Sequence, residues 1–268
     1  MPPLIAIHAC RSGVGRSQVA GCLSLALAHQ GQRIALIEAG LDRAGSSGTY
    51  RQAATTDLLR RFGLPPDYPP CALGLDWPEP APWDAAIADL SYLLGGLPPS
   101  NRAGALYLLR SDPALNADAA RLEPRLQALH QALQLDVLLL ALAPDLHPAS
   151  LTPLALSDEV LLVLTVDHRD FQATAVSAEV LRHLGAANVQ LVLNGVPAAL
   201  NTPQWQQQVE AAYEIPVAAL LPWAENMALL NGQELFYLRW PAAPFSQAVQ
   251  ALARQHLARG LGQQPALA

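Results

Sequence analysis

The chain begins with the segment that decides its fold: Pro3-Leu-Ile-Ala-Ile-His-Ala-Cys-Arg-Ser-Gly-Val-Gly-Arg-Ser17. A continuous apolar run at 4–9 predicts a buried strand, and an Ala- and Leu-rich stretch at 18–29 predicts a helix. The loop between them contains Gly13 and Gly15. Strand, glycine loop and helix, in this order, are typical of a loop that holds phosphate groups at a helix N-terminus.

The loop departs from the usual pattern at Arg16, which stands where such loops normally have lysine. The chain contains no lysine at all, and its 16 basic residues counted as Lys and Arg are arginines. Two interpretations stay open. Arg16 is an adapted phosphate contact, or it reflects drift in a genome that has replaced lysine everywhere and left poor or no binding.

Length and composition indicate a single α/β domain over residues 1–260, with a flexible tail at 261–268. Of the 268 residues, 51% are hydrophobic, which is enough for a large core. A net charge of −6 without lysine argues against nucleic-acid binding, which needs clustered positive charge. The three cysteines do not have metal-ligand spacing. Together with the lack of a recognisable targeting segment, they suggest reduced thiols in a cytoplasmic protein.

Apolar runs without strict alternation recur along the chain, separated by stretches with helical spacing. Such runs are typical of parallel strands that are covered on both faces. We therefore expect a mostly parallel, twisted sheet of about seven or eight strands with helices on both faces. Ser17 and Asp170 are candidate helix caps. The expected strands are 4–9, 33–37, 105–109, 137–143, 159–166, 189–193 and 216–221, and the expected helices are 18–29, 83–94, 118–134, 171–184, 204–213 and 245–259.

Two segments have a special composition. Seven prolines make residues 64–82 a stiff surface segment, either a connecting loop or a docking loop that presents Tyr68 and Trp77. The helix at 245–259 has an apolar stripe that includes Phe245 and Val249, and we expect it to dock on the sheet rather than on a membrane.

The glycine loop resembles the deviant Walker A loop of the MinD/ParA family of ATPases, Lys-Gly-Gly-x-Gly-Lys-Ser/Thr. Further segments that are similar to that family follow in the family's order, so the resemblance spans roughly residues 3–260. It implies a three-layer P-loop NTPase fold. The form Arg11-x-Gly-Val-Gly is most similar to the TadZ/CpaE branch, whose members localise pilus-assembly machinery. The further similar segments are Ile34–Gly40, Asp136–Pro144, Ser157–Thr165, Asn188–Asn194, Glu214–Pro222 and Asn231–Leu235.

The resemblance implies a site for ATP or ADP with Mg²⁺. Arg11 matches the lysine that crosses a sandwich dimer to the partner's nucleotide, and Ser17 would supply the hydroxyl for Mg²⁺. Asn194 and Pro222 match positions that contact the base. The implied nucleotide-binding residues are Arg11, Ser12, Gly13, Val14, Gly15, Arg16, Ser17, Gln18, Asn194 and Pro222.

The acidic residues of the family's site are altered. Glu38 replaces the first aspartate after the second strand, and Gly40 stands where the family has its water-activating aspartate. Ala141 stands where an aspartate would hold Mg²⁺ through water. Because these carboxylates support the metal and the attacking water, we expect hydrolysis to be weak or lost. Displaced acids that could take their place are Glu38, Asp42 and Asp145.

Three functional hypotheses follow. The first is a nucleotide-binding positioning, scaffolding or regulatory factor with degenerate hydrolysis. The second is an active ATPase switch in which Arg16 and the displaced acids carry the cycle, with Arg11 as a further catalytic candidate. The third is an interaction module that binds no nucleotide. The resemblance implies a homodimer, or a heterodimer with an intact paralogue, and no sequence feature points to nucleic acid or a membrane.

Overall fold

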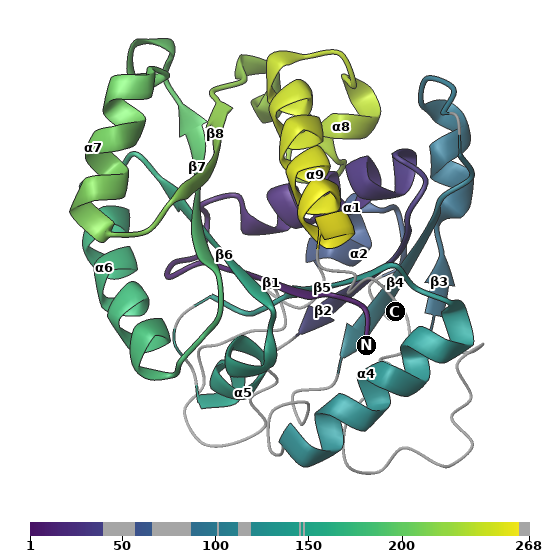
Figure 1. Ribbon diagram of the computed structural model, residues 1–268. Helices are drawn as coiled ribbons and strands as arrows, with labels where there is room; N and C mark the ends of the chain where they lie inside the picture. Colours follow the sequence, from purple (N-terminus) through teal and green to yellow (C-terminus); the bar gives the residue numbers. More distant parts are fainter. Residues whose placement is uncertain are drawn as a thin grey trace.

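The computed structural model describes residues 1–39, 57–65, 87–100, 102–111, 119–144, 146 and 148–262 (Figure 1). These residues form an eight-stranded sheet of order β3-β4-β2-β5-β1-β6-β7-β8. Seven strands run parallel, and the edge strand β3 runs antiparallel to β4. The strands are β1 (Leu4–His8), β2 (Arg33–Ala39), β3 (Ile87–Asp89), β4 (Ala105–Ser111), β5 (Val137–Ala141), β6 (Glu159–Thr165), β7 (Val189–Val196) and β8 (Val217–Pro222).

Helices cover both faces of this sheet, which confirms the predicted three-layer α/β fold (Figure 1). One layer contains α1 (Arg16–His29), α2 (Asp57–Arg61), α8 (Phe236–Arg239) and α9 (Pro244–Gly262). The other contains α4 (Ala119–Leu133), α5 (Pro148–Leu156), α6 (His168–His183) and α7 (Pro203–Tyr213). Short 3₁₀ turns follow β3, β7 and β8 at η2 (Ser91–Gly96), η4 (Ala198–Leu200) and η5 (Glu225–Leu230).

The strands hold the two layers together because their side chains alternate between the faces. In β5, Leu139 and Ala141 belong to the core under α1 and α9, whereas Leu138 and Leu140 belong to the core under α4 to α7. All four side chains are fully buried. Strands buried on both faces need apolar residues at every position, which is why the sequence shows continuous apolar runs.

Helix α1 is enclosed between the sheet and the other helices of its layer. Residues 16–28 are all buried. The apolar residues of this helix lie on all of its sides rather than on one face, as expected of a core helix. Helix α9 packs on it through the predicted stripe, in which Phe245, Val249 and Leu252 are almost fully buried. Within the described part of the chain, no helix has the length and apolar character needed to span a bilayer.

The predicted α-helix at 83–94 is wrong over residues 87–94, and its residues 83–86 lie outside the described residues. Ile87–Asp89 forms β3 instead, in which Ile87 pairs with Leu109, and the chain then turns through η2. The backbone N–H of Leu90 donates to the carbonyl of Leu106 at 2.8 Å. Pairing with the free edge of β4 therefore overrides the local helical spacing, and Gly95 and Gly96 further weaken a helix there.

Both predicted helix caps are also displaced. Helix α1 is capped by Gly15, and Ser17 lies in the first turn. Helix α6 begins at His168, and its cap is Asp167, whose side chain accepts a hydrogen bond from Arg169 N. Helix α9 reaches Gly262, two residues beyond the predicted domain boundary. Residues 66–82 of the proline-rich segment and 263–268 of the tail lie outside the described residues.

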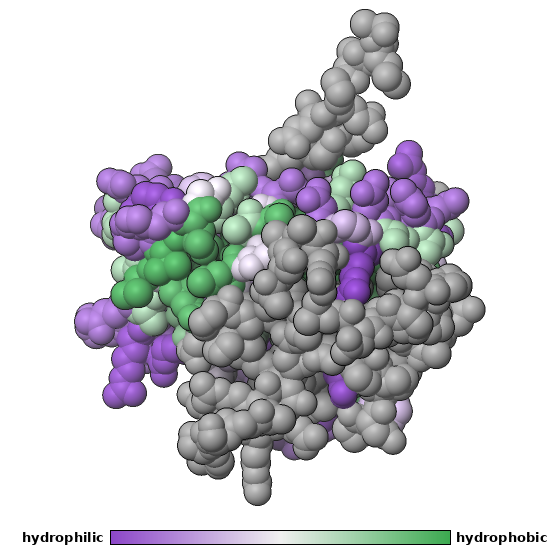
Figure 2. Space-filling model, turned by 90° about the horizontal axis from the view of Figure 1, so that it is seen from below, coloured by the Kyte–Doolittle hydropathy of each residue, from purple (hydrophilic) through white to green (hydrophobic). Residues whose placement is uncertain are grey.

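The surface is not evenly polar. Seen from below, hydrophobic residues gather on one side of the molecule, where Figure 1 places α5 and α6 (Figure 2). The apolar residues of these helices that stay at least partly exposed include Leu151 and Phe171, and Val176 is 62% exposed.

Candidate functional site

The glycine loop lies at the carboxyl end of β1, between β5 and β6. The chain passes from β1 to β2 on one side of the sheet, and β6 to β8 lie on the other side, so β1 marks the point where the strand order reverses. Ligands of open α/β sheets bind in the crevice at such a point. The topology therefore places the loop where a ligand site is expected.

Two glycines give the loop its shape. Gly13 has φ +85° and Gly15 has φ +87°, a left-handed conformation that side chains rarely adopt. Gly15 also leaves no room for a side chain, since a Cβ there would lie 2.2 Å from Nδ2 of Asn194. No described residue supplies a hydrogen-bond acceptor to the backbone N–H groups of residues 12–15. With the N-terminus of α1, these groups form a cradle for an anion.

Asn194 connects the loop to the predicted base-binding strands. Its Nδ2 donates to the carbonyl of Val14 at 2.8 Å. Pro222 lies on the neighbouring strand, where it pairs with Val196. The structure thus brings Asn194 to the glycine loop and Pro222 to the same end of the sheet, although neither residue lines the pocket described next.

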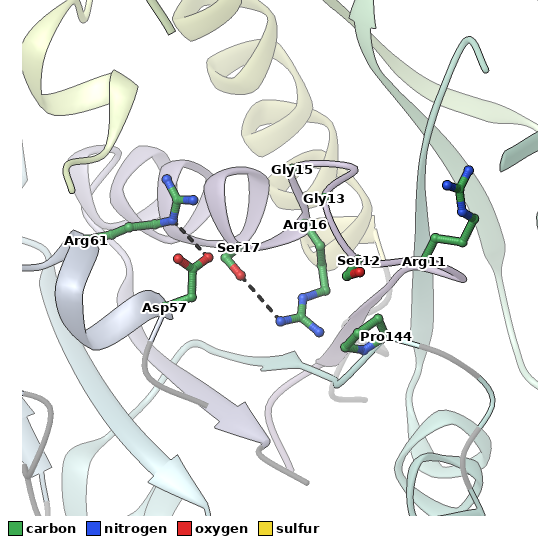
Figure 3. Close-up of a pocket in the computed structure, with 9 residues that line it drawn as sticks. All are labelled: Arg11, Ser12, Gly13, Gly15, Arg16, Ser17, Asp57, Arg61 and Pro144. Atoms are coloured by element: carbon green, nitrogen blue, oxygen red, sulfur yellow. Dashed lines mark hydrogen bonds and ion pairs between the residues drawn. The ribbon is translucent and has the colours of Figure 1, made fainter. Parts of the chain in front are cut away.

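A pocket of about 240 Å³ opens beside the loop (Figure 3). It is smaller than the roughly 300–1,000 Å³ typical of pockets for whole small molecules, and it suits part of a ligand, such as a phosphate chain. Six predicted nucleotide-binding residues line it, whereas Val14 and Gln18 are buried behind it. The lining residues are Arg11, Ser12, Gly13, Gly15, Arg16, Ser17, Asp57, Arg61 and Pro144.

The Arg16 side chain folds under the loop instead of extending into solvent, and its exposed fraction is 9%. Nη1 donates to the carbonyl of Leu142, just beyond β5, and Nη2 donates to Oγ of Ser17 at 3.3 Å (Figure 3). Nε is buried without a hydrogen-bond partner among the described residues. Burial lowers the pKa of Arg16, but a guanidinium keeps its proton in proteins.

The residues present do not fit a magnesium ion. Mg²⁺ prefers oxygen ligands, and the Ser17 hydroxyl already accepts a hydrogen bond from the Arg16 guanidinium. Ala141, fully buried at the end of β5, offers no ligand. No cluster of three metal-binding side chains occurs within the described ranges. The positively charged guanidinium of Arg16 thus already occupies the region beside Ser17.

Glu38 does not line the pocket, and its exposed fraction is 1%. Its Oε1 accepts a hydrogen bond from Leu58 N at 3.2 Å, and Oε2 has no hydrogen-bond partner in the described part of the chain. Burial raises the pKa of Glu38 to about 8, against the opposing effects of Leu58 N and of the Arg16 charge. Glu38 is therefore mainly protonated at neutral pH. The other acidic positions, Gly40, Asp42 and Asp145, lie outside the described residues.

The sequence analysis missed the carboxylate that does reach the pocket. Asp57, at the start of α2, accepts hydrogen bonds from Arg60 and from Arg61, each at 3.0 Å. Burial alone would raise the pKa of Asp57, but the charge and hydrogen bonds of Arg61, with help from Ser17 and Arg60, hold it below its usual range. Arg61 also donates to Oε1 of Gln18 at 2.6 Å. In the sequence, Asp57 lies three and four residues before the two arginines, a spacing that favours ion pairs on one face of a helix and could have indicated this group.

Arg11 borders the pocket but points away from Arg16 (Figure 3). Its Nη1 lies 2.7 Å from Oδ1 of Asp170 and 3.5 Å from Oδ1 of Asp167. Asp170 is largely buried and also accepts hydrogen bonds from the backbone N–H and the hydroxyl of Thr165. Arg11 is therefore held by the first turn of α6 of its own chain.

His8 ends β1 beneath the loop and is fully buried. Burial, followed by the nearby charge of Arg16, lowers the pKa of His8 to about 4. The imidazole is thus neutral at physiological pH. His8 therefore packs beneath the loop and adds no charge beside Arg16.

Comparison with known proteins reveals similarity of structure. No protein-family model and no curated protein sequence matches the chain. Among solved structures, the MinD cell division protein of Aquifex aeolicus has a TM-score of 0.72 at 14% identity and covers 99% of both chains.

Two further structures support this likeness. The septum site-determining protein MinD of Pyrococcus horikoshii, complexed with Mg-ADP, has a TM-score of 0.67 at 19% identity, covering 96% of this chain and 98% of the other. A ParA family ATPase of Chlorobium tepidum has a TM-score of 0.64 at 14% identity, covering 95% and 99%. The chain therefore has the fold of the MinD and ParA P-loop ATPases.

Proposed function

We propose that the chain is a MinD/ParA-like protein that binds ADP or ATP through its glycine loop and acts as a positioning, scaffolding or regulatory factor. The observation that carries this proposal is the cradle of residues 12–15, in which Gly13 and Gly15 turn the loop onto the N-terminus of α1. Its backbone N–H groups are available to an anion, and the pocket beside it is lined by three arginines and one carboxylate.

The base would lie towards Asn194 and Pro222, at the ends of β7 and β8. The hydrogen bond from Asn194 to Val14 couples that region to the phosphate loop. A nucleotide with its phosphates in the cradle would then touch the loop and the strand that supports it. Such a ligand would stabilise one arrangement of the site, which is what a positioning or regulatory protein requires.

We further propose that hydrolysis is weak or lost. Glu38 is buried, protonated at neutral pH and outside the pocket, so it does not serve as a base there. Asp57 is bound by Arg60 and Arg61. Ala141 offers no carboxylate at the end of β5. These features disfavour the alternative of an active ATPase switch. Slow or absent ATP turnover by the pure protein would contradict that alternative, whereas rapid turnover would contradict the proposal that hydrolysis is weak or lost.

One observation favours a second candidate, an interaction module that binds no nucleotide. The Arg16 side chain occupies part of the region below the loop, where it contacts Leu142 and Ser17. In this case the Arg16 side chain itself fills the region where a nucleotide would otherwise bind. The fold of the MinD and ParA proteins would then serve protein contacts. The partner would be a second copy of the chain or a paralogue. The Arg11-x-Gly-Val-Gly form supports a role in pilus assembly as one such function.

The test is equilibrium binding of a fluorescent ATP analogue and of ADP to wild-type protein and to Gly13→Ala. Gly13 lines the pocket, and a Cβ at this position meets no protein atom within 4 Å, so the added methyl group enters the space of the ligand. We expect saturable binding by wild type and a loss of at least about tenfold in the variant. The matched control is Gly185→Ala, which has a similar φ of +68° and an equally open site after α6.

Unchanged binding in Gly13→Ala would contradict the proposed site. No binding to wild type at millimolar nucleotide would favour the interaction module. If both alanine variants lost binding equally, backbone strain rather than the pocket would explain the effect, and the assignment of the loop would fail.

A further inference from the structure

The Arg16 guanidinium lies where two features of the loop meet. It donates to the Ser17 hydroxyl at the start of α1 and to the carbonyl of Leu142 beyond β5. Both acceptors are oxygen atoms, the kind of ligand that Mg²⁺ prefers. The protein thus places a fixed positive charge between the phosphate cradle and the end of β5.

Among the described residues, no carboxylate lies within ion-pair distance of this charge, although the Glu38 and Asp57 carboxyl groups act on it from farther away. Arg16 forms no ion pair with a described carboxylate, and its Nε lacks a hydrogen-bond partner there. The nearby Glu38 is held in its protonated form by burial, and Asp57 is already engaged by Arg60 and Arg61. A buried cation without a carboxylate in direct contact is unfavourable, and an anion in the adjacent pocket would relieve this.

We propose that Arg16 replaces the divalent cation, so that the polyphosphate of the nucleotide binds as the metal-free anion with Arg16 as its counter-ion. This inference rests on the proposed nucleotide binding and specifies its chemistry. An arginine offers several N–H donors to phosphate oxygens and carries a permanent charge. Mg²⁺ beside it would meet electrostatic repulsion and would have to displace the hydrogen bond to Ser17.

The arrangement also distinguishes Arg16 from the two other arginines of the pocket. Arg11 is paired with Asp170 at 2.7 Å, and Arg61 is paired with Asp57 at 3.0 Å. Each of these two arginines already has a carboxylate partner, whereas Arg16 has none within ion-pair distance among the described residues. Removing Arg16 should therefore reduce anion binding more than removing an exposed arginine elsewhere.

The deciding experiment measures the dissociation constant of ADP and ATP for wild-type protein by calorimetry, once in excess EDTA and once in excess Mg²⁺. We expect binding in EDTA that is equal to or tighter than binding in Mg²⁺. A requirement for Mg²⁺, seen as binding at least about tenfold weaker in EDTA, would overturn this inference and leave the proposed function intact. No binding in either buffer would overturn both.

A variant pair tests the residue itself. Arg16→Ala should weaken binding in EDTA by about 10- to 100-fold, the range expected for loss of hydrogen bonds from a charged donor. Arg239→Ala removes an exposed arginine of α8 and should leave the affinity unchanged. Equal affinities of Arg16→Ala and wild type in EDTA would contradict the role of Arg16.

A further measurement needs no variant, in case Arg16→Ala does not fold. Inorganic pyrophosphate in EDTA should raise the thermal unfolding midpoint of wild-type protein in a concentration-dependent manner, because a ligand of the folded state stabilises it. Adding Mn²⁺ to the protein with ADP should give no protein-bound Mn²⁺ signal in electron paramagnetic resonance. An unchanged midpoint, or a bound Mn²⁺ signal, would oppose the inference.

Discussion

At the scale of single residues, the fold changes the ionisation of three groups that lie in or next to the site. His8, Arg16 and Glu38 lie within one buried region at the carboxyl ends of β1 and β2, and each has a pKa displaced towards its neutral form. Two of them are consequently neutral at physiological pH, whereas Arg16 keeps its charge. Of these three groups, only Arg16 therefore contributes a charge to the pocket.

The residue-scale prediction concerns Glu38. Its pKa is about 8 in the folded protein against an ordinary value of 4.5, so the unfolded chain loses the proton first as pH rises. The free energy of unfolding of wild type therefore decreases between about pH 4.5 and 8, whereas Glu38→Gln lacks this loss. From pH 5 to pH 8, the free energy of unfolding of the variant should therefore rise by about 3 kcal/mol relative to that of wild type. Urea unfolding across this range measures the difference, and parallel pH profiles would refute the burial argument.

At the scale of elements, the start of α6 holds the loop in place. Asp170 in its first turn accepts hydrogen bonds from Arg11 and from both donors of Thr165, and so joins the glycine loop, the end of β6 and α6. Asp167, the cap of the same helix, is 58% exposed and lies 3.5 Å from Arg11. Two carboxylates of one helix end thus differ strongly in burial and in the number of groups they bind.

This difference predicts unequal effects of substitution. Asp170→Ala leaves Arg11 and the Thr165 donors without their shared acceptor and should lower the free energy of unfolding by about 2–3 kcal/mol. Asp167→Ala removes an exposed cap and should lower it by about 1 kcal/mol. Chemical unfolding of both variants provides the measurement. Similar losses in the two would mean that Asp170 acts only as part of the helix end.

At the scale of the whole molecule, every central strand belongs to both layers. Leu138 and Leu139 of β5 are neighbours in sequence, but they lie in the cores on opposite faces of the sheet. Neither layer can separate from the sheet without exposing apolar residues of the strands. We therefore expect the two layers to unfold together.

The corresponding prediction uses three alanine variants. Leu138→Ala and Leu139→Ala should each lower the free energy of unfolding by about 2–5 kcal/mol, because each leaves a cavity in a fully buried core. Val176→Ala, at a 62% exposed position, should change it by less than about 0.5 kcal/mol. Both core variants should shift the same single transition in urea. Two separate transitions, each sensitive to one variant, would indicate layers that unfold independently.

The sequence by itself determined the local elements and their order. Continuous apolar runs specify strands buried on both faces, and the glycine residues after β1 specify a loop that leads into α1, because these signals depend on neighbours along the chain. Only the tertiary structure decided the remaining features. The edge of β4 turned part of a predicted helix into β3, and α2 brought Asp57 and Arg61 to the loop. The direction of Arg16 depends on Leu142, which is 126 residues away in the sequence. Charge and hydrogen bonding at the site thus arise from contacts between distant segments, which local patterns do not encode.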